Sequence, residues 1–213
     1  MRYKAILFDM DGTLLDTLTD MADAVNHILS VHGWPLRTIE EVRAFVGNGA
    51  RRLMERAVPP EVTGGDFEAV LTEYRDWYQT HNCVATAPYP GIPALLAALA
   101  KAGIKTAVVS NKPDATTKTL AARFFPGLPA FGQRDDVPPK PAPDLVFRAL
   151  ESRGVDAADA IYVGDSEVDV ATARNAGLPL AAVSWGFRGR RALAEAGAAV
   201  IVDTAAELLE VLR

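Results

Sequence analysis

A short apolar run that ends in two aspartates is the feature that most constrains how this chain folds. Residues 5–8 read as a buried β-strand, and Asp9-Met10-Asp11-Gly12-Thr13 follows directly. In a continuing strand, residues two apart share one face, so the carboxylates of Asp9 and Asp11 would repel each other. A divalent cation makes such a pair favourable, and it also suits a carboxylate that attacks phosphorus.

Short apolar runs recur in the second half of the chain and alternate with helical patterns. The strands are expected at 106–110, 160–163, 180–183 and 199–202, with a further short one near 130–131. The helices are expected at 92–102, 114–124, 144–153, 168–176, 190–196 and 204–212. Nearly continuous apolar strands are typical of a parallel sheet that is buried on both faces. The pattern therefore predicts an α/β fold with a Rossmann-like parallel sheet.

The segment between the first strand and this α/β pattern reads as helical throughout. Asp16 or Thr17 caps a helix that ends near residue 33, and Thr38-Ile39-Glu40-Glu41 fits a capping box that opens a second. Further helices are expected at 50–58 and 66–81. Because the first strand must pair within the sheet, we expect an α/β domain of residues 1–15 and 89–213. Residues 16–88 then form an inserted helical domain.

Composition excludes several classes of protein. The net charge of −5 and the lack of a broad cluster of basic residues argue against a nucleic-acid partner. Cys83 is the single cysteine, so no internal disulfide can form, which is compatible with a reducing cytosol. The chain shows no secretory signal and no run near the roughly 20 apolar residues that span a membrane. We expect a cytoplasmic protein, monomeric or homodimeric.

Polar residues of reactive types follow several of the predicted strands. Ser110-Asn111-Lys112 follows one strand, Gly164-Asp165 another, and Lys140 lies in a proline-rich loop. Taken singly, each has an ordinary explanation as a turn residue, a helix cap or a solvated charge. Because ligands bind beyond the carboxyl ends of parallel strands, their joint placement predicts one site with acids, a hydroxyl and a cation.

These motifs, in this order, resemble those of the haloacid dehalogenase-like phosphatases over essentially the whole chain. Asp9-Met10-Asp11-Gly12-Thr13-Leu14 is similar to the first motif of that family and Ser110-Asn111-Lys112 to the second. Lys140-Pro141 is similar to the third, and Gly164-Asp165 with Asp169 to the fourth. The helical insertion corresponds to the small cap domain of the family.

The resemblance implies a role for each motif residue. Asp9 is the nucleophile that forms an aspartyl phosphate, and Asp11 is the general acid and then the general base. Mg²⁺ is expected on the carboxylates of Asp9 and Asp165 and the backbone carbonyl of Asp11. Ser110 and Lys140 are expected to bind phosphoryl oxygens, with hydrogen bonds added by Thr13 and Asn111. Asp169 is expected to orient metal-bound water or Lys140. No role is assigned to Lys112, for which a surface position is expected.

The substrate is indicated by the cap. Residues 45–50 and 53–57 resemble the cap of bacterial phosphoglycolate phosphatases, and the turn Trp185-Gly186-Phe187, outside the cap, resembles a late aromatic-glycine turn of that family. Gly47, Asn48 and Gly49 would let the backbone approach a substrate closely. Residues 16–88 contain no lysine, which disfavours hydrolases and mutases that use a cap lysine.

The favoured substrate is therefore a small phosphomonoester, 2-phosphoglycolate first. A sugar-phosphate, nucleotide or pyrophosphate phosphatase is the alternative, and a non-catalytic phosphate-binding protein is a remote one.

Overall fold

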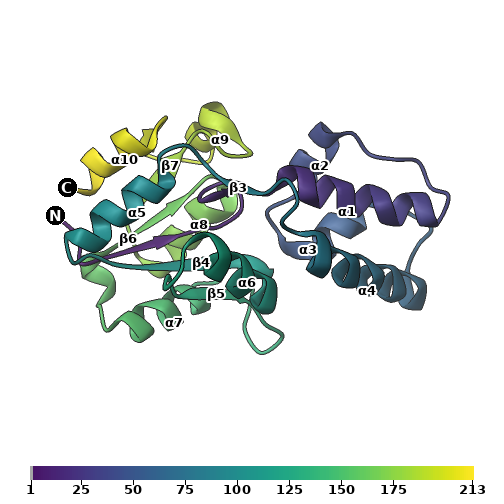
Figure 1. Ribbon diagram of the computed structural model, residues 1–213, viewed down its shortest axis with the longest axis horizontal. Coiled ribbons are helices and arrows are strands. Elements are labelled where there is room, and N and C mark those ends of the chain that lie inside the picture. The colour runs from purple at the N-terminus through teal and green to yellow at the C-terminus, as the bar shows by residue number, and fades with distance from the viewer. Residues whose placement is uncertain (1) are drawn as a thin grey trace. The chain divides into compact units, whose positions relative to one another are not determined.

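The computed structural model describes residues 2–213, which divide into two compact units. One unit comprises Met1–Asp16 and Pro88–Arg213, and the other comprises Thr17–Ala87. Figure 1 shows how the second is inserted into the chain of the first. The two connections between them carry the short strands β2 (Leu15–Asp16) and β3 (Ala87–Pro88), which pair with each other.

The first unit contains a β-sheet and the helices that flank it. Its strands are β1 (Ala5–Phe8), β4 (Lys105–Pro113), β5 (Ala130–Gln133), β6 (Ala160–Gly164), β7 (Leu180–Val183) and β8 (Ile201–Val202). Its helices are α5 (Ile92–Lys101), α6 (Asp114–Phe124), α7 (Asp144–Arg153), α8 (Glu167–Ala176), α9 (Gly189–Glu195) and α10 (Ala205–Leu212), with a 3₁₀ turn at Ala157–Asp159.

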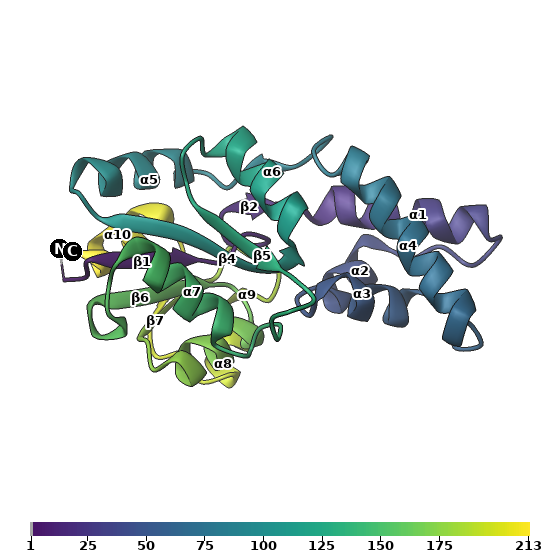
Figure 2. The ribbon, with the colours of Figure 1, turned by 90° about the horizontal axis from the view of Figure 1, so that it is seen from below.

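The strands form one parallel sheet in the order β5-β4-β1-β6-β7-β8. Strand β1 is central, and Leu7 pairs with Ala107 on one side and Tyr162 on the other. Figure 1 shows α5 and α10 together on one face and α7 on the opposite face, which Figure 2 shows from below. Buried side chains of α7 and α8, such as Leu145 and Ala173, form a core with this second face. Burial on both faces explains why β1 and β6 are apolar throughout.

The helical unit contains α1 (Leu18–Val31), α2 (Ile39–Phe45), α3 (Gly49–Ala57) and α4 (Gly64–His81). The capping box predicted at the start of α2 is present. The Thr38 hydroxyl accepts a hydrogen bond from the Glu41 backbone, and the Glu41 carboxylate accepts one from the Thr38 backbone. Helices α1 and α4 pack against each other along their apolar faces.

A buried aspartate ties the first helix of this unit to its last loop. Asp20 lies in the first turn of α1 and is almost fully buried. Its carboxylate accepts hydrogen bonds of 2.8–3.0 Å from the backbone N–H groups of Val84, Ala85 and Thr86. The Thr86 hydroxyl donates a further bond of 2.7 Å. Four bonds to one carboxylate compensate for the loss of its hydration.

The predicted fold class is confirmed, and the differences from the expected elements lie at their ends. Strand β4 runs on to Pro113, beyond the expected end at residue 110, because β5 continues to pair with it after a register shift. Strand β8 is shorter than expected. Strands β2 and β3, each of two residues, are too short to give a periodic pattern. None of the helices that the structure describes is long and apolar enough to cross a membrane.

Replacing Asp20 by alanine should destabilise the helical unit. The Asp20→Ala change would leave three backbone N–H groups without their acceptor, which we expect to lower the free energy of unfolding by roughly 2–4 kcal/mol. Urea unfolding followed by circular dichroism measures this. Asp23→Ala, on an exposed position of the same helix, is the matched control and should change stability by less than about 0.5 kcal/mol. Equal midpoints for the two variants would contradict the role of Asp20.

Candidate active site

The site lies where the order of the strands reverses around β1. The chain leaves β1 between β4 and β6, and in open α/β sheets the crevice beyond such a switch point binds ligands. The sheet ends here in Asp9, whose backbone N–H still donates to the carbonyl of Val163 at 2.9 Å. The next residues turn sharply, because the carbonyl of Met10 accepts from the backbone N–H groups of Thr13, Leu14 and Leu15.

One oxygen of the Asp9 carboxylate is fixed by two contacts. Oδ1 accepts a 2.7 Å hydrogen bond from the Met10 backbone N–H and lies 3.0 Å from the ammonium of Lys140. The other oxygen, Oδ2, forms no hydrogen bond or ion pair with the residues that the structure describes. The side chain is buried apart from about a tenth of its surface. The two contacts therefore orient the Asp9 carboxylate through Oδ1 and leave Oδ2 available to bind a ligand.

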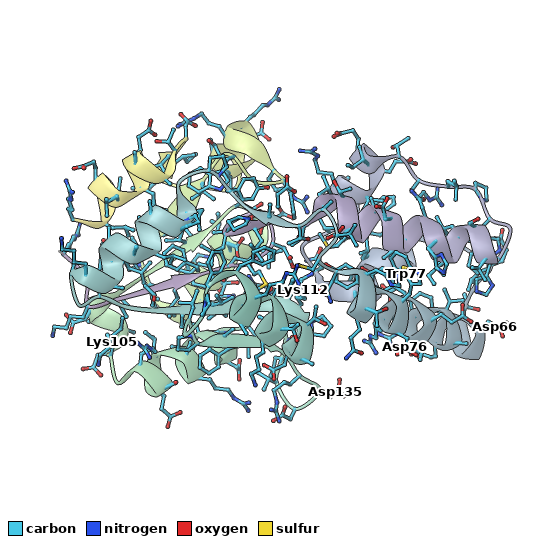
Figure 3. The ribbon with its side chains drawn as sticks, viewed as in Figure 1. Asp66, Asp76, Trp77, Lys105, Lys112 and Asp135 are labelled. Atoms are coloured by element: carbon cyan, nitrogen blue, oxygen red, sulfur yellow. The ribbon has the colours of Figure 1, made fainter. Side chains whose placement is uncertain are left out.

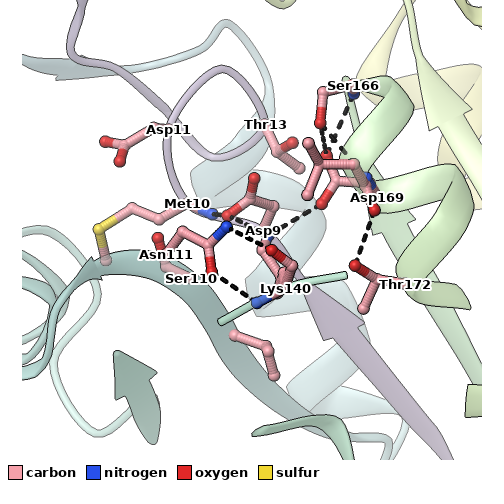
Figure 4. A network of polar contacts seen from close by, with 12 residues as sticks. Asp9, Met10, Asp11, Thr13, Ser110, Asn111, Lys140, Ser166, Asp169 and Thr172 are labelled. Carbon is pink, nitrogen blue, oxygen red and sulfur yellow. Dashed lines mark hydrogen bonds and ion pairs between the residues drawn. The ribbon is translucent and has the colours of Figure 1, made fainter. Parts of the chain in front are cut away.

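Lys140 reaches this point from the proline-rich loop, and its side chain is 2% exposed. Its ammonium lies 2.9 Å from Oδ1 of Asp169, in addition to Asp9. The amide of Asn111 holds the backbone of Lys140 in both directions, with bonds of 3.0 and 2.8 Å. Figure 4 shows this lysine between the end of β1 and the start of α8. The loop thus supplies a buried cation whose position is set by both its backbone and its side chain.

Two further aspartates come from the end of β6 and the start of α8. Oδ1 of Asp165 accepts from the Thr13 hydroxyl at 2.9 Å, and its Oδ2 accepts from the Phe187 backbone N–H at 2.8 Å. Asp169 caps α8: its Oδ2 accepts bonds from the backbone and hydroxyl of Ser166 and from the backbone of Asp165. Both oxygens of Asp169 are therefore engaged, the second by Lys140.

The charges of this cluster call for a cation. Carboxylate oxygens of Asp9, Asp165 and Asp169 all lie within 4.8 Å of one another and are buried. Lys140 offsets one of the three negative charges. Burial raises the pKa of Asp165 to about 7, and the charge of Asp169 adds to this effect. Burial also raises the pKa of Asp9 well above its usual range, against the opposing effect of Lys140.

A divalent cation would balance the two remaining charges, and carboxylate oxygens are the ligands that Mg²⁺ prefers. Asp9 and Asp165 fit such an ion best, because each oxygen of Asp165 accepts a single hydrogen bond, whereas Oδ2 of Asp169 accepts three and its Oδ1 is paired with Lys140. The donor set thus fits the expected ion.

The two acids of the first motif do not share a face. Because the chain turns after Asp9, the side chain of Asp11 points away from the cluster, as Figure 4 shows. Lys112 lies 3.2 Å from its Oδ1. The surface position allowed for Lys112 is wrong: its side chain is only 4% exposed, and a lysine in the interior needs an anionic partner. Each acid of the pair thus has its own lysine.

The remaining predicted residues fall into two groups. Ser110 is buried within β4, three residues before the strand ends, and its hydroxyl oxygen accepts from the Lys112 backbone N–H at 3.2 Å. Thr13 and Asn111 lie in the same α/β unit, and the contacts described above join them to Asp165 and Lys140. Gly47, Asn48 and Gly49 belong to the helical unit, at the turn that opens α3. Gly47 and Gly49 have positive φ angles of 112° and 82° there.

Comparison with known proteins identifies the family. The model of the family described as haloacid dehalogenase-like hydrolase matches residues 6–183. The chain belongs to this family. It is 36% identical to N-acetylmuramic acid 6-phosphate phosphatase of Pseudomonas aeruginosa, over 100% of this chain and 96% of the relative. It is 35% identical to phosphoglycolate phosphatase of Pseudomonas savastanoi pv. phaseolicola, over 97% of this chain and 78% of the relative.

The structure agrees with these relationships. A crystal structure of a Lactobacillus delbrueckii subsp. bulgaricus protein, proposed to be a phosphoglycolate phosphatase, superposes with a TM-score of 0.94 at 37% identity. The alignment covers 100% of this chain and 99% of that one. The predicted resemblance to haloacid dehalogenase-like phosphatases and the predicted class of enzyme, a phosphoric monoester hydrolase, are both confirmed.

Sequence reasoning missed two groups that contact the active site of this hydrolase, the turn at residues 185–187 and the hydroxyl of Tyr162. The turn at residues 185–187 meets the cluster directly. Trp185 donates its indole N–H to the carbonyl of Thr13 at 3.1 Å, and a methyl on Gly186 would overlap the backbone of Gly12 and the side chain of Asp165. Tyr162 places its hydroxyl on Lys140. A tyrosine in an otherwise apolar buried strand is the signal for the second contact, because its hydroxyl needs a partner.

Neutralising Asp165 should remove the effect of Mg²⁺ on stability. In the metal-free, folded protein the pKa of Asp165 is about 7, whereas the ordinary pKa of an aspartate is 3.8. Stability in EDTA should therefore fall as pH rises from about 4 to 7. The increase in melting temperature that Mg²⁺ causes should be larger at pH 8 than at pH 5.

Differential scanning fluorimetry of Asp165→Asn checks this. The variant should lose most of the Mg²⁺-dependent increase, whereas Asp135→Asn, at an exposed position that Figure 3 labels, should keep it. An increase of the same size in both variants would argue against a metal site on Asp165.

Proposed function

We propose that this hydrolase cleaves a small phosphomonoester through an aspartyl phosphate on Asp9, with Mg²⁺ as cofactor. The observation that carries the proposal is the fixed orientation of the Asp9 carboxylate. Its Oδ1 is held by Lys140 and by the Met10 backbone, and Asp165 lies beside it. A carboxylate fixed at one oxygen needs little reorganisation before the other oxygen attacks phosphorus.

The metal would be held by the carboxylates of Asp9 and Asp165 and by the backbone carbonyl of Asp11. When bound, Mg²⁺ would offset the repulsion between Asp9 and the phosphate dianion. Thr13 and the backbone of Phe187 orient Asp165 by donating to its two oxygens. Asp169 acts from further away, by holding Lys140.

In the first step an oxygen of Asp9 bonds to phosphorus, and the bond from phosphorus to the leaving oxygen breaks. Asp11 gives its proton to that oxygen. In the second step Asp11 takes a proton from water, which attacks phosphorus and releases Asp9. The hydroxyl proton of Ser110 forms no hydrogen bond with the residues that the structure describes, so Ser110 is available to donate to a phosphoryl oxygen. Thr13, Asn111 and Lys140 add to the binding of the phosphate.

The favoured substrate is 2-phosphoglycolate, which agrees with the names of several relatives. N-acetylmuramic acid 6-phosphate is the second candidate, because the phosphatase named for it matches this chain over 96% of its own length. Both compounds carry a carboxylate on the leaving group. Residues 16–88 supply arginines and no lysine, and Gly47, Asn48 and Gly49 are the proposed backbone contacts to the substrate. We place the enzyme in the cytoplasm, as a monomer or homodimer.

Asp9→Asn should abolish turnover and keep the fold. The amide is a poor nucleophile, so kcat should fall by at least about 100-fold with p-nitrophenyl phosphate and Mg²⁺. Asp156→Asn, an exposed position of the same unit, should keep the wild-type rate. The circular dichroism spectra of both variants should match the wild type. Activity of Asp9→Asn above about 1% of wild type would refute the nucleophilic role.

Comparing kcat/KM across substrates identifies the leaving group that the enzyme prefers. We expect 2-phosphoglycolate or N-acetylmuramic acid 6-phosphate to exceed hexose phosphates, nucleotides and pyrophosphate by about tenfold or more. A flat profile would contradict a dedicated enzyme. Absence of turnover with every compound in the presence of Mg²⁺ would support a phosphate-binding protein instead.

A further inference from the structure

Tyr162 is a buried polar residue for which the proposed reaction has no role. It lies in the middle of β6, three residues before Asp165, and its exposed fraction is 0%. Its hydroxyl lies 3.0 Å from Nζ of Lys140, 3.2 Å from the carbonyl of Val109 and 3.3 Å from Oδ1 of Asp169. Burying a hydroxyl is costly unless it is bonded, and a phenylalanine would fill a buried strand without that cost. The hydroxyl therefore has a purpose beyond packing.

Its main partner is the ammonium of Lys140. An ammonium carries three N–H groups, and three acceptors lie within 3.0 Å of this one: Oδ1 of Asp9, Oδ1 of Asp169 and the Tyr162 hydroxyl. The three N–H groups are thus matched by three acceptors before any substrate is present. The hydroxyl can accept from Lys140 while it donates its own proton to Val109 or Asp169.

The three acceptors differ in strength. The carboxylates of Asp9 and Asp169 carry a charge opposite to that of the ammonium and the phenol is neutral, so the two aspartates hold Lys140 more firmly than Tyr162 does. If a phosphoryl oxygen is to take a hydrogen bond from Lys140, one acceptor must yield. Tyr162 is the one that yields at least cost, since its hydroxyl keeps a partner in Val109 or Asp169.

We propose that Tyr162 is a positioning residue that holds the third N–H of Lys140 until a phosphoryl oxygen replaces it. In the free enzyme the hydroxyl keeps the ammonium against Asp9. When phosphate binds, the ammonium shifts so that its hydrogen bond to the hydroxyl is exchanged for one to the phosphoryl oxygen, while Asp9 and Asp169 stay within ion-pair distance. The proposal rests on the proposed function, because it assumes that Lys140 contacts phosphate.

The Tyr162→Phe variant removes the hydroxyl and keeps the ring. One N–H of Lys140 then lacks its acceptor in the free enzyme and regains one only when phosphate is bound. Inorganic phosphate should therefore bind more tightly, with a dissociation constant lower by about tenfold, the size expected for one hydrogen bond to a charged group. The KM of the substrate should fall in the same direction, and kcat should fall with it because the product phosphate leaves more slowly.

Titration calorimetry with inorganic phosphate and Mg²⁺ measures the binding without any turnover. Tyr3→Phe is the matched control, because Tyr3 is a buried tyrosine of the same unit outside the site, and its phosphate affinity should equal that of the wild type. If Tyr162→Phe does not fold, Tyr162→Met, which also lacks a hydroxyl, takes its place. Melting temperatures of all variants separate an effect on the fold from one on Lys140.

The outcomes separate the two proposals. Tighter phosphate binding together with a lower kcat in Tyr162→Phe supports the positioning role. Unchanged or weaker binding, in a variant that folds and beside a wild type that hydrolyses its substrate, overturns it and leaves the proposed function intact. If the wild type neither binds phosphate nor turns over any phosphomonoester, the proposed function falls and the role of Tyr162 falls with it.

Discussion

The buried ammonium of Lys140 is the interaction on which the rest of the site depends. A lysine in the interior is stable only with anionic partners close by, and here Asp9 and Asp169 lie at 3.0 and 2.9 Å. The same pairing fixes one oxygen of Asp9. The amide of Asn111 holds the loop from which Lys140 comes. Strand ends, loop and helix start are thus brought together by one charge, although they are far apart in the sequence.

Electrostatics also explains how the two acids of the first motif coexist. The sequence suggested two like charges on one face that needed a metal between them. The turn after Asp9 separates them, and each side chain pairs with its own lysine, Lys140 or Lys112. The need for a cation remains, but it arises because Asp9 lies beside Asp165 and Asp169, which come much later in the sequence.

The sequence predicted most of the fold, because the apolar strands are short, uniform and separated by segments with helical periodicity. It also placed Asp9, Ser110, Lys140 and Asp165 at one sheet edge, since the ends of parallel strands meet there. It could not show that Lys112 is buried or that the backbone of Phe187 bonds to Asp165, because both depend on tertiary contacts. For Tyr162 the sequence offers a signal, a hydroxyl in an otherwise apolar strand, but not the identity of the partner, because Lys140 comes from a loop that is distant in the sequence.

Asp169 has two structural functions at once. One of its oxygens caps the first turn of α8, and the other bonds to the ammonium of Lys140. Local opening of that helix end would therefore release Lys140 and, with it, the orientation of Asp9. In terms of hydrogen exchange, the amides at the start of α8 report on the assembly of the site as well as on the helix. The stability of this helical turn therefore contributes to the stability of the site.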